Sequence, residues 1–155
     1  MLHRLINLIA EKEILKRLYI ACKPRTVFNR LADHEDMANW PGITGSILVK
    51  EGSPRNGMGA IRKINVAGLT LLEEIVEFEP PRRMAYTIIK GLPVKHRGTI
   101  TLKEDTNGTL LEWQIRLTSH WPFLGPIMRV ALDIGLERAL HWVKNQLESH
   151  HEKPI

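Results

Sequence analysis

The middle of the sequence alternates between apolar and polar residues in short runs, a pattern typical of half-buried β-strands. Seven such strands are predicted, at 13–21, 43–51, 57–66, 69–79, 84–89, 95–104 and 109–118. Turn-forming residues such as Ala67-Gly68 and Gly91-Leu92-Pro93 separate the last six. Because a parallel connection needs a dozen or more residues and these links are shorter, the pattern predicts an antiparallel sheet.

Two short helices are predicted between the first and second strands. Pro24 is suited to the first turn of a helix, and Val27, Phe28 and Leu31 follow on one face until Asp33. A second short helix is predicted over 35–39 and ends before Trp40-Pro41, since the residue before proline avoids helical backbone.

A long helix is predicted after Pro122, where apolar residues recur at steps of three and four up to Leu147. Its 25 or so residues span roughly 38 Å, enough to cross a curved sheet. Gly135 lies inside this helix, where glycine lowers helix stability by about 1 kcal/mol relative to alanine. We expect the close approach of another backbone or of a ligand to compensate for this loss. Residues 2–9 have the pattern of a further short amphipathic helix.

Length and composition indicate one domain of 155 residues with ordinary apolar content. We place an N-terminal helical extension at 1–12, the domain at 13–149 and a flexible tail at 150–155. The chain has 22 basic and 17 acidic residues, but the basic residues are scattered over every segment, so no nucleic-acid partner is predicted. A weak contact of residues 2–9 with a membrane surface stays open.

Cys22 is the one cysteine, so neither an internal disulfide nor a zinc site based on paired cysteines can form, and a cytoplasmic location is expected. His150-His151-Glu152 at the C-terminus offers too few preorganised ligands for a specific metal site. No phosphate-binding or dinucleotide fingerprint is present. The sequence therefore predicts neither a metal nor a cofactor.

An ordered set of short motifs spans residues 13–148. Its members are Pro24-x-x-Val27-Phe28-x-x-Leu31-x-Asp33, Trp40, Gly57-x-Gly59-x-x-Arg62, Glu74-Ile75, Phe78-x-Pro80-Pro81-Arg82-Arg83, Tyr86 and Gly108-Thr109-x-x-x-Trp113. The set resembles the SRPBCC group, and within it the polyketide cyclase/dehydrase branch. The resemblance implies the START-like helix-grip fold: an α+β domain whose seven-stranded curved antiparallel sheet wraps around the C-terminal helix. It also implies a hydrophobic cavity between sheet and helix, and it leaves the reaction open.

Alternation along the strands predicts which side chains face that cavity. Arg62 shares a face with Met58, Ala60 and Ile64, and Glu74 shares a face with Thr70, Leu72, Val76 and Phe78. Because an unpaired buried charge is costly, we predict that Arg62 and Glu74 pair, either directly or through a polar ligand. A bridge that only fixes strand register is the alternative. The predicted ligand-binding residues are Trp40, Arg62, Glu74, Tyr86, His96, Ile100, Trp113, Met128, Leu132 and Gly135.

The preferred function is the binding of a small hydrophobic or amphipathic ligand, such as a lipid, an isoprenoid or an aromatic polyketide. One alternative is a cyclase or dehydratase in which Arg62, Glu74, Tyr86 or His96 orients a carbonyl group or moves a proton. A second is an interaction module whose own side chains fill the pocket. The oligomeric state is not predicted.

Overall fold

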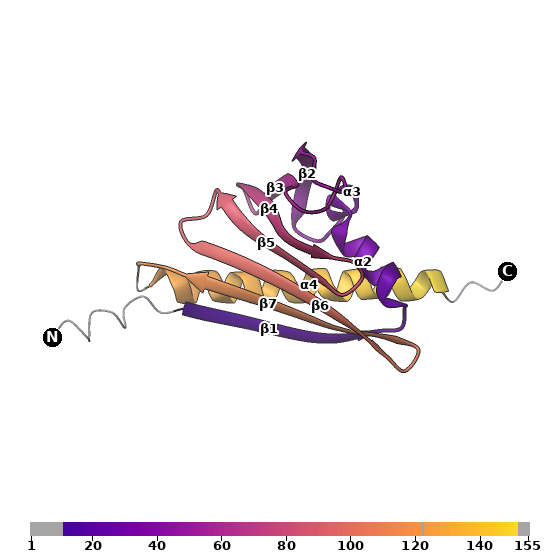
Figure 1. Ribbon diagram of the computed structural model, residues 1–155. Coiled ribbons are helices and arrows are strands. Elements are labelled where there is room, and N and C mark those ends of the chain that lie inside the picture. The colour runs from indigo at the N-terminus through magenta and orange to yellow at the C-terminus, as the bar shows by residue number, and fades with distance from the viewer. Residues whose placement is uncertain (1–10, 122, 152–155) are drawn as a thin grey trace.

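The computed structural model describes residues 11–121 and 123–151 (Figure 1). The segment 2–9 and most of the predicted tail lie outside the described residues. The elements follow the order β1 (Glu11–Ile20), α2 (Pro24–Ala32), α3 (His34–Met37), β2 (Ile43–Lys50), β3 (Ile61–Val66), β4 (Leu69–Glu79), β5 (Arg83–Lys90), β6 (Lys95–Asp105), β7 (Gly108–Thr118) and α4 (Leu124–His151).

All seven strands form one antiparallel sheet in the order β1-β7-β6-β5-β4-β3-β2. β1 returns beside β7, while the other neighbours follow in sequence, so β1 and β2 are the two edges. Figure 1 shows α4 along one face of the curved sheet, with α2 and α3 toward the C-terminal half of α4. The predicted helix-grip architecture is confirmed.

The two short helices begin and end where the local chemistry favours it. Pro24 occupies the first turn of α2, where a missing N–H breaks no helical hydrogen bond. Asp33 ends α2 and caps α3, because its side chain accepts hydrogen bonds from the backbone N–H groups of Glu35 at 2.9 Å and Asp36 at 3.4 Å. The buried face of α2, with Phe28 and Leu31, then packs into the core.

The core divides α4 into two halves with different neighbours. Leu140, Val143 and Leu147 in the C-terminal half are buried in the hydrophobic core. Met128 and Leu132 in the N-terminal half are only partly buried and border a cavity instead. The C-terminal half therefore anchors the helix in the core, and the N-terminal half covers the cavity.

β4 departs from simple alternation. Ile75 is opposite Tyr86 while Glu77 is opposite Ala85, so Val76 is an extra residue in the ladder, a β-bulge. Ile75 and Phe78 consequently both face the core, and the inward residues before the bulge are Leu71 and Glu73. The prediction was right for Phe78 but wrong for the residues that it placed on the same face before the bulge, since it continued the phase of Phe78 through the bulge. Those residues are Thr70, Leu72, Glu74 and Val76.

β3 is shorter than the sequence predicted, because it begins at Ile61 and not at residue 57. The preceding segment is a compact turn closed by a bridge between Ser53 and Met58, with Gly59 at a positive φ of 82°. A left-handed backbone of this kind suits glycine and interrupts a strand.

Candidate functional site

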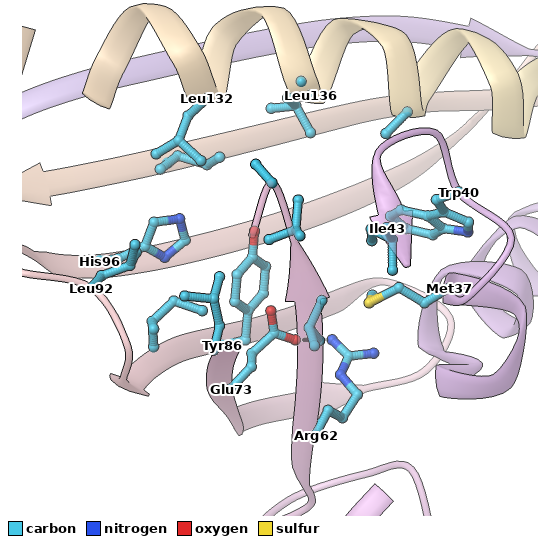
Figure 2. Close-up of a pocket in the computed structure, with 18 of the residues that line it drawn as sticks. Met37, Trp40, Ile43, Arg62, Glu73, Tyr86, Leu92, His96, Leu132 and Leu136 are labelled. Atoms are coloured by element: carbon cyan, nitrogen blue, oxygen red, sulfur yellow. Dashed lines mark hydrogen bonds and ion pairs between the residues drawn. The ribbon is translucent and has the colours of Figure 1, made fainter. Parts of the chain in front are cut away.

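A cavity of about 310 Å³ lies between the N-terminal half of α4 and the concave face of the sheet (Figure 2). Its walls come from β2 to β7, from α2 and α3, from the turns at Pro41, Ala67 and Leu92, and from α4. Almost all of the lining side chains are aliphatic or aromatic, and the polar or charged ones are Arg62, Glu73 and His96, with the hydroxyl of Tyr86. A site of this size and composition suits a small, largely apolar molecule.

The cavity opens to solvent beside α4. Lining residues that are themselves exposed mark the mouth: Pro41, Ala67 and Leu69 on the sheet side, and Ala131 and Gly135 on the helix. A Cβ atom added to Gly135 would have no atom within 4 Å beyond its own helix. Among the described residues no backbone therefore approaches Gly135, so the first predicted compensation is absent. Compensation by a ligand stays a prediction.

Arg62 and Glu73 form a buried ion pair at one wall of the cavity. They are opposite each other on β3 and β4, and their side chains are only 3% and 7% exposed. Arg62 Nη2 donates to Glu73 Oε1, as the dashed line in Figure 2 shows. The pairing predicted for Arg62 was therefore right in kind but wrong in partner, because the bulge in β4 turns Glu73 inward in place of Glu74.

The ion pair leaves part of the guanidinium unused. Arg62 Nε and Nη1 are buried and have no hydrogen-bond partner among the described residues. A buried donor without an acceptor costs about 1–3 kcal/mol. Neither nitrogen is accessible from the cavity, so Arg62 lines it with other atoms and these donors are a cost of burying the pair.

Tyr86 on β5 is held by neighbours on β6 and β7. Trp113 Nε1 on β7 donates to the Tyr86 hydroxyl at 3.1 Å. Gly98, opposite Tyr86 on β6, lies under the ring, since an added Cβ would come within 2.1 Å of Tyr86 Cζ. Burial and the nearby Glu73 carboxylate raise the pKa of Tyr86, so the hydroxyl stays protonated.

His96 lies beside Tyr86, with ring centroids 5.6 Å apart and planes tilted by 32°. His96 is 7% exposed as a residue, and its Nδ1 has no hydrogen-bond partner among the described residues. Burial lowers the pKa of His96 to about 4, so the ring is neutral at pH 7. Because Nδ1 itself is closed off from the cavity, His96 presents other atoms of a neutral ring to it.

The two predicted tryptophans form an aromatic wall. Trp40 and Trp113 pack edge to face with centroids 6.2 Å apart. Trp40 Nε1 donates to Asp36 at 3.1 Å, so Trp40 offers the cavity only apolar surface.

Every predicted ligand-binding residue except Glu74 lines the cavity. Sequence reasoning missed Glu73 and Gly98. The signal for Gly98 was present, because a glycine inside a strand marks a close approach, whereas nothing in the alternation signalled the bulge that turns Glu73 inward.

A family model described as polyketide cyclase / dehydrase and lipid transport matches residues 15–150. No curated protein matches the sequence. Among the described residues, no helix is both long enough and apolar enough to span a lipid bilayer.

Several solved structures share the fold. The protein XoxI from Bacillus cereus is 20% identical with a TM-score of 0.74, over 91% of this chain and 99% of that one. A START superfamily protein from Mycobacterium smegmatis is 15% identical with a TM-score of 0.73, over 88% and 97%. The di-domain ARO/CYC BexL of the BE-7585A biosynthetic pathway is 18% identical with a TM-score of 0.76, over 93% of this chain and 51% of that one.

Proposed function

This chain belongs to the polyketide cyclase / dehydrase and lipid transport family, and we propose that it binds a small, largely apolar molecule in the cavity under α4 without transforming it. The observation that carries the proposal is an open cavity of about 310 Å³ under α4 whose lining is almost entirely apolar. An apolar ligand removes its surface from water there, which favours binding in proportion to the apolar area buried.

The first experiment asks whether the cavity takes a ligand. Native mass spectrometry of the purified protein would reveal molecules that co-purify with it. A fluorescence titration with N-phenyl-1-naphthylamine, an uncharged apolar probe, would measure binding directly, and we expect saturable binding to one site. Absence of both co-purified molecules and probe binding would contradict the proposal.

A blocking variant links that binding to this cavity. Gly135 has open space where its side chain would be, so Gly135→Phe places a ring at the mouth without a clash at Cβ. Ile134→Phe is the matched control, because Ile134 is the preceding residue of α4 and is 48% exposed outside the cavity lining. We expect Gly135→Phe to weaken probe binding at least tenfold and Ile134→Phe to leave it within twofold.

A cyclase or dehydratase is the second candidate function. A protonated Tyr86 hydroxyl and a neutral His96 ring face the same cavity, and this is a pairing of a potential acid with a potential base. Incubation with a linear aromatic poly-β-ketone, followed by mass spectrometry for loss of water, tests it. Turnover that disappears in His96→Leu and Tyr86→Phe would favour catalysis over binding alone.

The remaining alternative is an interaction module whose own side chains fill the pocket. The described side chains leave the cavity open, which does not support this alternative. A cytoplasmic location belongs to our proposal, since Cys22 is a free buried thiol. Contact of residues 2–9 with a membrane surface stays a prediction.

A further inference from the structure

The outer side of α4, which faces away from the cavity and the sheet, changes character along the helix. In the first half it is apolar, and in the second half it continues as the exposed polar residues Arg138, His141 and Asn145. The apolar residues are between 48% and 81% exposed, and four of them recur at steps of three or four, as residues on one helix face do. They form an apolar patch that consists of Trp121, Phe123, Ile127, Val130 and Ile134.

The apolar patch has no function in the fold that the described residues show. The described lining of the cavity includes none of its members, and α4 packs into the core through its opposite face, with Leu136, Leu140 and Val143. Single exposed apolar residues are common, but a contiguous group of this kind marks a surface that meets a protein or a membrane.

The patch lies at the end of the sheet whose connections lack acidic residues. Three connections meet there, at 67–68, 91–94 and 119–123, because the turns of an antiparallel sheet alternate between its two ends (Figure 1). These connections and the residues next to them include the exposed Lys90 and Lys95 but no aspartate or glutamate. Each connection at the opposite end contains or adjoins an acidic residue, namely Glu51, Glu79 and Asp105.

The acidic side chains beside the patch are already paired. Asp133 and Glu137, on the flank of α4 toward β1, contact Lys16 at 2.9 and 2.7 Å. Glu11 on β1 lies 3.6 Å from Arg116. The two exposed lysines of the connections therefore give this end of the molecule a positive potential, which attracts an anionic surface.

The mouth of the cavity opens directly beside the patch. Ala131 and Gly135, which line the mouth, follow Val130 and Ile134 in α4. A surface that covers the patch therefore also lies against the mouth.

We propose that the apolar patch docks on a lipid bilayer that contains anionic lipids. In this arrangement Trp121 and Phe123 lie at the level of the headgroups, which aromatic side chains favour, and Ile127 and Val130 reach the boundary of the acyl chains. The two lysines add an attraction to anionic headgroups of about 1 kcal/mol each. An apolar ligand can then pass between bilayer and cavity without crossing water. Only this passage rests on the proposed function, and docking does not depend on it.

A second copy of the chain is a less suitable occupant. A stable protein interface takes about 20–30 residues from each partner, far more than the patch offers, and the positive ends of two copies would repel each other. Binding to a bilayer depends on the inserted apolar area and on charge, and it needs no matching shape.

Co-sedimentation with vesicles tests the docking surface. Wild-type protein is incubated with vesicles of phosphatidylcholine alone and with vesicles of phosphatidylcholine and phosphatidylglycerol in equal parts. We expect it to sediment with the mixed vesicles, and we expect a partition coefficient at least about tenfold lower with phosphatidylcholine alone, since the two lysines then lose their attraction.

A double variant assigns the contact to the patch. Ile127→Gln with Val130→Gln makes the middle of the patch polar and should lower the partition coefficient at least about tenfold, because less apolar area is inserted. The matched control is Ile47→Gln with Val49→Gln, since these residues are 51% and 49% exposed on the edge strand β2, outside the patch. We expect the control to bind within about twofold of wild type.

A second double variant, Leu5→Ser with Ile6→Ser, separates the patch from residues 2–9. We expect it to sediment with the mixed vesicles as the wild-type protein does. Analytical ultracentrifugation without vesicles tests for the second copy, and we expect a monomer.

Four results would overturn the docking surface. Three are failure of the wild-type protein to sediment with mixed vesicles, equal sedimentation of the patch variant and the wild-type protein, and loss of sedimentation only in the variant of residues 2–9. The fourth is a dimer that dissociates in the patch variant and does not sediment, which would assign the patch to self-association. All four leave the proposed function standing if N-phenyl-1-naphthylamine still binds. Vesicle binding by a protein that takes up no probe would overturn the proposed function alone.

Discussion

Replacement of Arg62 and replacement of Glu73 should both destabilise the protein, but to different extents. Arg62→Met leaves the Glu73 carboxylate buried without a partner, but the carboxyl group can escape the charge by taking up a proton. The substitution also removes the unpartnered Nε and Nη1 donors of Arg62. Glu73→Leu, by contrast, leaves a guanidinium that cannot lose its proton and has no acceptor at all among the described residues.

The burial of the pair determines the size of the effect. Both side chains are less than a tenth exposed, and loss of one partner from a buried pair costs about 3–5 kcal/mol. We expect Arg62→Met to be near the lower figure and Glu73→Leu near the upper. Replacement of both, as Arg62→Met with Glu73→Leu, removes charge and orphaned donors together and should restore the free energy of unfolding to within about 1 kcal/mol of wild type or raise it.

Equilibrium urea unfolding, followed by far-ultraviolet circular dichroism, measures these differences. With a urea dependence of about 2 kcal/mol per molar, a loss of about 4 kcal/mol moves the midpoint by about 2 M. Glu74→Gln serves as the control, because Glu74 is only partly buried and makes no ion pair or hydrogen bond with the described side chains. Its free energy of unfolding should change by less than about 0.5 kcal/mol.

Two results would refute this reasoning. If both single variants remained within about 1 kcal/mol of wild type, the pair would be accessible to water in solution. If Arg62→Met were more destabilising than Glu73→Leu, the unpartnered N–H groups would not be a cost in the free protein.

The other predictions concern single sites. His96 in the unfolded chain titrates near its ordinary pKa of about 6.5 and in the folded protein near 4, so the unfolded state takes up the proton first as the pH falls. The free energy of unfolding should therefore drop by about 2 kcal/mol between pH 7.5 and pH 5 because of His96, and the His96→Leu variant should lack this part of the decrease. An identical pH dependence of the two proteins in urea titrations would contradict the prediction. Gly135→Ala should raise the free energy of unfolding by about 1 kcal/mol, measured by the same method, since nothing obstructs the new methyl group; a decrease would reveal a contact at Gly135. Gly98→Ala should cost about 1–3 kcal/mol, because its Cβ would overlap the Tyr86 ring, and near-wild-type stability would show that the ring can move aside. Sedimentation with anionic lipid vesicles tests the contact predicted for residues 2–9, and a variant without residues 1–10 that sediments equally would exclude it.

Local patterns in the sequence were enough to predict the architecture. Alternation located the strands, short connections required antiparallel neighbours, and the change to a helical period located α4. Most of the cavity lining followed from the same alternation: Arg62, Tyr86, His96 and Trp113 all face inward as expected. These features depend on the period of the backbone, which each segment carries by itself.

The tertiary structure decided what depends on the pairing of distant segments. The bulge at Val76 arises where β4 pairs with β5, and it turns Glu73 inward and Glu74 away from the cavity. The close fit of Tyr86 over Gly98 requires the register between β5 and β6. Whether the space under α4 is filled or open depends on how the side chains of nine elements and of the turns between them meet in three dimensions, which no single stretch of sequence determines.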